Sequence, residues 1–325
     1  MFLKKNIYLI VFCVFLVFSG TVCAAQSFIT ISTASMGGPS YATGNAFANH
    51  LNHTVLAEEY KFNAIEGGGS SKNVMAISNK DVELATIRGG VAYEAFYAKG
   101  KYSEREPASS MRALFAMWPS AIQIITLQKY SDLNSVPDLK GKKMDVGERN
   151  NARELVFRSI VETYGINYWE KDDIDAIYIG YSEATSMLKD RKIVATVASG
   201  LPPIAKVSEA DAMMSIKLIP IDQKNVDELV EKTGYFLPYV IPGGTYEGEQ
   251  RDILTISDFQ LMVCHQDLTD ELAYEIVKEI DENLNQFQKT HAAFKDFNII
   301  QGANKCTIPL HPGAEKYFRE KGYIQ

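Results

Sequence analysis

Three arginines occupy places in the sequence where a carboxylate could be bound. Arg88 ends an apolar stretch and is followed by two glycines, whereas Arg149 and Arg153 lie in a later loop that begins at a glycine. A guanidinium group donates two parallel hydrogen bonds to a carboxylate. We therefore predict that Arg88 and one arginine of the later loop contact an anion. Two alternatives stay open: Arg88 forms a salt bridge on the lobe surface, and a later arginine pairs with Glu148 or Glu154.

The loops around these arginines share one design, in which a short strand leads through glycine or small polar residues into a helix. A helix that begins this way leaves backbone N–H groups unpaired at its positive end, where anions bind. In open α/β sheets, ligands bind beyond the carboxyl ends of the strands. We expect one ligand site to be lined by four such loops, residues 36–41, 67–73, 88–90 and 147–153.

The residue patterns of known catalytic and metal sites are absent from the sequence. The five histidines are scattered, and the neighbours Cys264 and His265 would point to opposite faces of a strand. No phosphate-binding loop, zinc motif or serine-hydrolase elbow is present. We predict that the protein is not an enzyme and uses no cofactor and no metal.

The length and charge of the chain favour an exported, two-lobed protein. Its 325 residues exceed what one small core needs. Residues 1–25 hold two lysines, an apolar run and small residues at the end, which is typical of a secretory signal peptide. Removing them takes the net charge from −7 to −9, which argues against nucleic acid as a partner. We expect a periplasmic monomer.

Two cysteines, Cys264 and Cys306, follow the predicted signal peptide. A disulfide is allowed in an oxidising compartment, but sequence alone does not bring the two sulfurs together. A bridge and two free thiols are equal alternatives.

The elements that must position the arginines alternate between strand and helix, as in an α/β fold with a mainly parallel sheet. Strands at residues 28–32, 60–66 and 82–88 each precede a helix, and Ser70 is expected to cap the second of these helices. A similar series begins with a strand at residues 143–146. The repetition predicts two α/β lobes.

Two apolar segments predict connections between the lobes. Residues 111–127 read as two strands broken at Trp118–Pro119–Ser120, and residues 253–264 read as a long strand that returns to the first lobe. A helix follows, with Thr269 as its cap and an apolar face that extends to Phe287. We assign residues 1–25 to the signal peptide, 26–117 plus 270–325 to lobe 1, and 118–269 to lobe 2.

An ordered set of motifs resembles one family over nearly the whole mature chain. The chain opens with a strand, Gly37–Gly38–Pro39–Ser40–Tyr41 and a helix. The other motifs are Glu66–Gly67–Gly68–Gly69–Ser70–Ser71–Lys72–Asn73, Asp138–Leu139–Lys140–Gly141–Lys142–Lys143, Gly180–Tyr181–Ser182–Glu183–Ala184, Ile241–Pro242–Gly243–Gly244–Thr245–Tyr246 and Pro309–Leu310–His311–Pro312–Gly313–Ala314–Glu315–Lys316–Tyr317. Together they resemble the TAXI-type solute receptors of tripartite ATP-independent periplasmic (TRAP) transporters.

This resemblance implies a two-lobed type II periplasmic-binding-protein fold with hinge strands, a small ligand held between the lobes, and integral-membrane TRAP permease subunits as partners. Ligands of such receptors are small carboxylates such as amino acids and keto acids. The implied ligand contacts, together with the arginines above, are Met36, Gly37, Gly38, Ser40, Tyr41, Ser70, Asn73, Arg88, Trp118, Arg149, Asn150, Asn151, Arg153, Ser199 and Gly200.

Two loops depart from the family's pattern. Arg88–Gly89–Gly90 stands where relatives have Gln followed by Ser or Asn and Asp, and Asn150–Asn151–Ala152–Arg153 replaces a Gly-Ser-Gly-Thr loop. The added arginines lead us to expect a more acidic ligand, either an acidic amino acid or a dicarboxylate. An exported sensor or surface interaction protein with the same binding fold is the alternative function.

Overall fold

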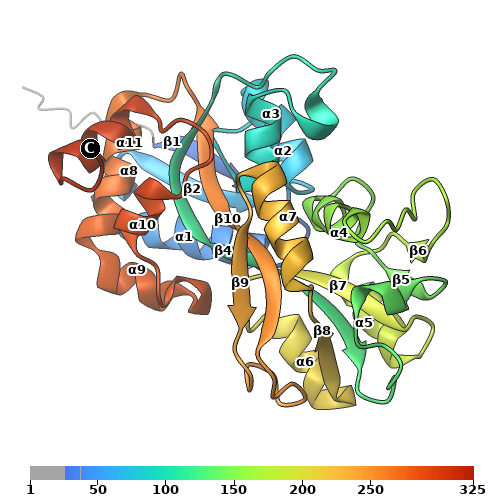
Figure 1. Ribbon diagram of the computed structural model, residues 1–325. Coiled ribbons are helices and arrows are strands. Elements are labelled where there is room, and N and C mark those ends of the chain that lie inside the picture. The colour runs from blue at the N-terminus through green and yellow to red at the C-terminus, as the bar shows by residue number, and fades with distance from the viewer. Residues whose placement is uncertain (1–25, 37) are drawn as a thin grey trace, which may run out of the picture.

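The computed structural model describes residues 26–36 and 38–325, which form one ten-stranded mixed sheet flanked by helices (Figure 1). The main strand order is β2-β1-β3-β10-β4-β7-β5-β6, with β8 paired to β4 and β9 paired to β10. The strands are β1 (Ser27–Ser32), β2 (Tyr60–Ile65), β3 (Leu84–Arg88), β4 (Met111–Leu127), β5 (Lys143–Asp145), β6 (Asp175–Ile177), β7 (Ala195–Gly200), β8 (Ile216–Ile219), β9 (Leu237–Ile241) and β10 (Ile253–His265).

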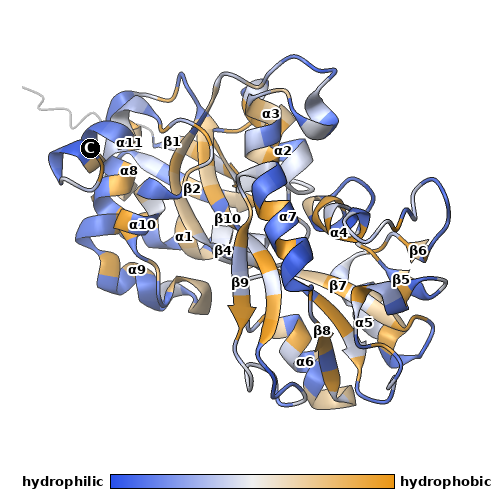
Figure 2. Cartoon of the chain, viewed as in Figure 1, coloured by the Kyte–Doolittle hydropathy of each residue, from blue (hydrophilic) through white to orange (hydrophobic). Residues whose placement is uncertain are grey.

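The helices connect these strands and cover both faces of the sheet. They are α1 (Pro39–Leu51), α2 (Ser70–Ser78), α3 (Gly89–Phe96), α4 (Ala152–Glu162), α5 (Tyr181–Lys189), α6 (Ala205–Met214), α7 (Gln223–Thr233), α8 (Asp270–Glu282), α9 (Leu284–Thr290), α10 (Ile299–Asn304) and α11 (Pro312–Glu320). Figure 2 shows hydrophobic residues concentrated on the strands and hydrophilic residues along exposed helices such as α7.

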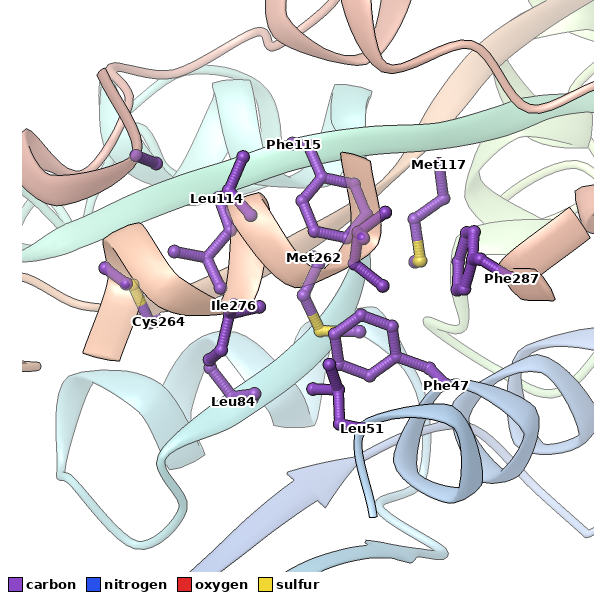
Figure 3. Close-up of a cluster of buried hydrophobic side chains, with 14 of the residues drawn as sticks. Phe47, Leu51, Leu84, Leu114, Phe115, Met117, Met262, Cys264, Ile276 and Phe287 are labelled. Atoms are coloured by element: carbon purple, nitrogen blue, oxygen red, sulfur yellow. The ribbon is translucent and has the colours of Figure 1, made fainter. Parts of the chain in front are cut away.

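Lobe 1 is built around β1, β2 and β3, which run parallel to one another. Helices α1, α8 and α9 pack on one face, where Phe47, Phe115 and Phe287 belong to a fully buried cluster (Figure 3). Helices α2 and α3 cover the other face with a second cluster that includes Ile77 and Ala92. Burial of these apolar side chains stabilises lobe 1 and fixes where its strand ends lie.

Lobe 2 is built around β5, β6 and β7, which also run parallel. Phe157 and Ile160 of α4 belong to one buried cluster, and Val207 of α6 belongs to another. The predicted α/β, two-lobed type II periplasmic-binding-protein fold with hinge strands is therefore confirmed.

Two long antiparallel strands, β4 and β10, run through both lobes. Residues 111–121 of β4 pair with β10, and residues 121–126 of β4 pair with β7 of lobe 2. The predicted crossing is confirmed, but the predicted break of the strand at Pro119 is wrong. Pro119 pairs with Phe259 of β10, and β7 pairs with β4 only from Ala121 onward, so Pro119 lies in the ladder to β10 but outside the ladder to β7.

Strand β10 changes its pairing partner along its length. Residues 253–257 of β10 pair with β9, whereas Gln260 to Cys264 pair with β3. The pairing of β10 with β4 has register shifts between Gln260 and Leu261 and between Met262 and Val263, within the part of β10 that pairs with β3. The change of partner depends on strands that are distant in sequence, so the local pattern of β10 does not reveal it.

Three other local predictions have clear outcomes. Ser70 is the first residue of α2, whose cap is Gly69, so the predicted Ser70 cap is wrong; the hydroxyl accepts a hydrogen bond from the Arg88 backbone N–H instead. Thr269 caps α8 as predicted. The helix predicted to reach Phe287 is divided at Asn283 into α8 and α9.

Both cysteines are free thiols, which decides between the two alternatives. Burial raises the pKa of Cys306 to about 12 and also raises that of Cys264. The predicted signal peptide lies outside the described residues. Within residues 26–36 and 38–325, no helix has the length and apolar character needed to cross a membrane.

Candidate functional site

A cleft lies between the lobes, at the carboxyl ends of the parallel strands of both. Lobe 1 supplies the loops that follow β1 and β2 and the end of β3, whereas lobe 2 supplies the loop before α4, the start of α5 and the end of β7. The hinge strands form the rest of its wall. The lining residues are Ala34, Ser35, Gly38, Pro39, Ser40, Gly69, Ser70, Thr86, Arg88, Trp118, Ser120, Glu148, Asn151, Ala152, Arg153, Tyr181, Ser199, Gly200 and Gln260.

Arg88, at the end of β3, connects lobe 1 to the hinge and to lobe 2. Its side chain is 4% exposed and forms an ion pair with Asp258 of β10. The same guanidinium donates hydrogen bonds to the carbonyl of Ser120 in β4, at 2.8 Å, and to Ser199 Oγ in β7. Arg88 Nε is buried and has no hydrogen-bond partner among the described residues. Because buried donors are nearly always paired, this unpaired N–H is unusual for a protein interior.

Arg153, near the start of α4, has contacts that all belong to lobe 2. Its guanidinium lies 3.4 Å from Asp145 Oδ2 and donates to the carbonyls of Val197 and Ile179, at 2.7 and 2.6 Å. It also stacks on Tyr181, with 4.2 Å between Cζ and the ring centroid. These contacts tie the ends of β5 and β7 to α4 and α5, so Arg153 both lines the cleft and shapes its wall.

Several helices begin at the cleft. The caps of α1, α2 and α5 are Gly38, Gly69 and Gly180, and none of these helices has a side-chain cap. Gly69 has a φ of 89°, a conformation that favours glycine. The start of α3 is occupied differently, because the Gly90 N–H donates to Asp258 Oδ2 at 2.9 Å. Three positive helix ends therefore remain to favour an anion in the cleft.

The two lobes touch around the cleft. Ser35 Oγ donates to Glu148 Oε2 at 3.2 Å, and Ser71 Oγ donates to the Asn150 carbonyl at 3.1 Å. These contacts join lobe 1 to lobe 2 across the mouth of the cleft. The structure therefore shows the lobes closed on each other.

A further contact joins the lobes behind the cleft. Tyr235 Oη donates to Glu94 Oε1 of α3 at 2.8 Å. Burial raises the pKa of both groups. This partly buried hydrogen bond is a further contact between the two lobes.

Most of the predicted contact residues line the cleft. They are Gly38, Ser40, Ser70, Arg88, Trp118, Asn151, Arg153, Ser199 and Gly200. Their contact with a ligand stays a prediction. Arg88 and Arg153 each form an ion pair, but not the pairs given as alternatives. Arg88 pairs with Asp258 inside the protein rather than on the lobe surface, and Arg153 pairs with Asp145 rather than with Glu148 or Glu154.

Other predicted residues lie outside the cleft wall. Met36 is 68% exposed, and Tyr41 and Asn150 are also absent from the lining. Asn73 is buried and donates to the carbonyls of Ser32, Thr33 and Thr86, so its role is structural. Arg149 is exposed and stacks on Tyr178 at 3.9 Å. Gly37 lies outside the described residues.

Sequence reasoning missed several lining residues, notably Tyr181 and Gln260. Tyr181 follows Gly180 at the start of a helix, which is the same signal that pointed to the other loops. Glu148 lies in the predicted loop of residues 147–153 but was not singled out as a contact. Gln260 lies inside an apolar strand, where nothing in the sequence marks it as facing a cleft.

Comparison with known proteins identifies the family and the fold. Residues 31–322 match the model of the NMT1-like family. A protein of Bordetella bronchiseptica RB50 has a similar structure, with a TM-score of 0.54 at 13% identity over 91% of this chain and 98% of that one. A Xanthomonas citri protein solved bound to ATP gives 0.50 at 9% identity, over 92% and 100%. The periplasmic aliphatic sulphonate binding protein of Escherichia coli gives 0.49 at 13%, over 91% and 84%.

Proposed function

Because this chain belongs to the NMT1-like family and has two lobes closed around a cleft, we propose that it is an extracytoplasmic solute-binding protein. It captures a small carboxylate between the lobes and delivers it to a TRAP-type membrane permease. The observation that carries this proposal is the position of Arg88. One guanidinium contacts lobe 2 and both hinge strands, and it keeps a buried N–H without a partner among the described residues.

Arg88 explains how a ligand would favour the closed form. A carboxylate oxygen that accepts from Arg88 Nε lies at the junction of both lobes, where it also meets the positive ends of helices from each lobe. In an open form these donors would separate, and the ligand would contact only one set. Such differential contact is what allows a ligand to shift a protein toward one of two conformations.

The charge balance of the cleft argues against a second carboxylate group on the ligand. Arg88 and Arg153 are each paired with a buried aspartate, and Glu148 adds a negative charge to the lining. The expectation of an acidic amino acid or a dicarboxylate rested on two available arginines. Among the described residues that line the cleft, no second cation remains to pair with a second carboxylate.

The permease partner and the periplasmic location rest on the sequence. The motifs that resemble TAXI-type receptors, from Glu66–Asn73 to Pro309–Tyr317, support a TRAP permease as the partner, and residues 1–25 support export. A permease that recognises the closed form would receive loaded protein in preference to empty protein.

A thermal-shift screen of the purified protein tests the proposal. The probes are monocarboxylates, amino acids, dicarboxylates, sugars and inorganic phosphate. A ligand present at about 100 times its Kd stabilises the fold by about 2.7 kcal/mol. We expect shifts with carboxylates and none with sugars. Shifts confined to sugars or phosphate would contradict the proposed ligand class.

A further inference from the structure

An apolar groove opens from one side of the cleft. It lies between the start of α1 and the turn at residues 292–294 in lobe 1, and the loop from β7 to α6 in lobe 2. The residues that line it are Gly38, Pro39, Ala42, Trp118, Tyr181, Leu201, Pro202, Pro203, Ile204, Ala205, Lys206, His291, Ala292 and Ala293. Four of these, Trp118, Tyr181, Lys206 and His291, carry polar side-chain groups, and the other ten are glycine, alanine, proline, leucine or isoleucine.

The groove and the cleft share part of their walls. Gly38, Pro39, Trp118 and Tyr181 line both spaces. The cleft itself has a cavity volume of about 70 Å³, and the groove has about 230 Å³. A ligand whose carboxylate meets Arg88 in the small cleft therefore finds most of the available space beside it, in the groove.

Three of the four polar side chains of the groove have partners within the protein. Lys206 Nζ lies 2.7 Å from Glu209 Oε2, and His291 Nδ1 accepts from the Ala293 N–H at 3.0 Å. Tyr181 Oη is 3.0 Å from both the N and the O of Ser199. What the groove offers to a ligand is therefore the apolar surface of its proline, alanine, leucine, isoleucine and tryptophan side chains, which suits hydrocarbon.

Both lobes contribute to this apolar surface. Trp118 is 3% exposed, and its ring packs against Phe294 with centroids 5.5 Å apart. Leu201 follows β7 of lobe 2 but packs against the core cluster of lobe 1. A hydrocarbon chain in the groove would touch both lobes. Its burial would therefore stabilise the closed form, as the carboxylate contact does.

We propose that the groove is a subsite for the hydrocarbon tail of the ligand, so that the protein prefers monocarboxylates with an aliphatic or aromatic tail over those with a charged far end. This inference rests on the proposed function, because the tail is placed by a carboxylate bound at Arg88. It adds a selection for tail length and polarity that the cleft alone does not provide.

Calorimetric titration with a homologous series tests the subsite. The probes are propionate, pentanoate and octanoate, with glutarate and suberate as matched dicarboxylates. Burying one CH₂ contributes about 0.8 kcal/mol, so affinity should rise by up to about fourfold for each methylene until the groove is filled. The dicarboxylates should show no such gain, because the far carboxylate would be buried among apolar side chains.

Two alanines of α6 provide a matched pair of variants. Ala205 and Ala212 are both exposed, but only Ala205 lines the groove. In Ala205→Phe, we expect the gain with chain length to be lost while propionate binds as in the unmodified protein. Ala212→Phe should keep the full gain.

Different failures of this experiment have different meanings. If propionate and octanoate bind equally well, or if Ala205→Phe keeps the chain-length gain, the subsite is wrong but the proposed function stands. If no carboxylate of any length binds, the proposed function fails together with the subsite.

Discussion

Arg88 and Arg153 occupy comparable places in the two lobes, each buried at the cleft beside an aspartate, yet their contacts differ in reach. Arg88 contacts the β10 aspartate, β4 and the lobe 2 residue Ser199. Arg153 contacts only lobe 2 elements, including the Asp145 carboxylate and the Val197 carbonyl. Arg88 therefore joins the two lobes, whereas Arg153, in a similar position, stabilises lobe 2 alone.

The difference shows why the charge of a cleft residue is a poor guide to its role. Both guanidinium groups are neutralised by buried aspartates, so neither attracts a ligand by net charge alone. What distinguishes Arg88 is that it keeps a buried N–H without a partner among the described residues and that its contacts cross the hinge. We therefore propose that Arg88 recognises the ligand and that Arg153 stabilises lobe 2.

The largest expected effect is on stability. Arg88→Ala and Arg153→Ala each leave an aspartate buried without its cation, which costs about 3–5 kcal/mol. Both variants should show this loss in urea unfolding. The charge-neutral pairs Arg88→Gln with Asp258→Asn and Arg153→Gln with Asp145→Asn should recover most of it. A single variant as stable as the unmodified protein would show that its ion pair is solvent-screened.

The second expected effect is that lobe 1 loses stability at mildly acidic pH before lobe 2 does. Four of the five histidines, all but His265, lie in the residues assigned to lobe 1, and burial lowers the pKa of His50 and His311 from the ordinary 6.5. Between the lowered values and 6.5 the unfolded chain binds more protons than the folded one, so stability falls as the pH drops below 6.5. As the pH is lowered, backbone amides of lobe 1 should lose their protection against hydrogen exchange before those of lobe 2.

A pair of substitutions in α1 checks the source of this pH dependence. His50 is 5% exposed and packs against Phe287 with ring centroids 5.3 Å apart, whereas His53 is exposed. His50→Leu should weaken the fall of stability below pH 6.5, and His53→Leu should leave it unchanged. Equal responses from the two variants would assign the acid sensitivity to other groups.

The smallest expected effect concerns the hydroxyls beside the two arginines. Ser199→Ala removes the lobe 2 partner of Arg88 and should weaken carboxylate binding by about 1 kcal/mol, or about fivefold. Thr196→Val removes the hydroxyl that donates to Asp145 at 2.7 Å and should lower stability without changing affinity. Calorimetric titration of both variants measures the contrast, and a larger loss of affinity in Thr196→Val would reverse the assigned roles.

Local patterns in the sequence predicted the lobes and most of the cleft, because strand–glycine–helix units place loops at one sheet edge. The same patterns could not pair Arg88 with Asp258, which lies 170 residues away within an apolar strand. The continuous path of β4 through Pro119 depends on where the neighbouring strand β7 ends. Such features are set by contacts between distant segments, and a single sequence does not reveal them.

The most direct test of the account compares carboxylate affinity in the two charge-neutral double variants. Each removes one buried ion pair without leaving a charge uncompensated, so both should fold. We predict that Arg88→Gln with Asp258→Asn loses binding of the carboxylate found in the screen, by more than tenfold in Kd. Arg153→Gln with Asp145→Asn should bind within a few-fold of the unmodified protein. Full binding by the Arg88 pair, or an equal loss in both, would contradict the central claim that Arg88 recognises the ligand.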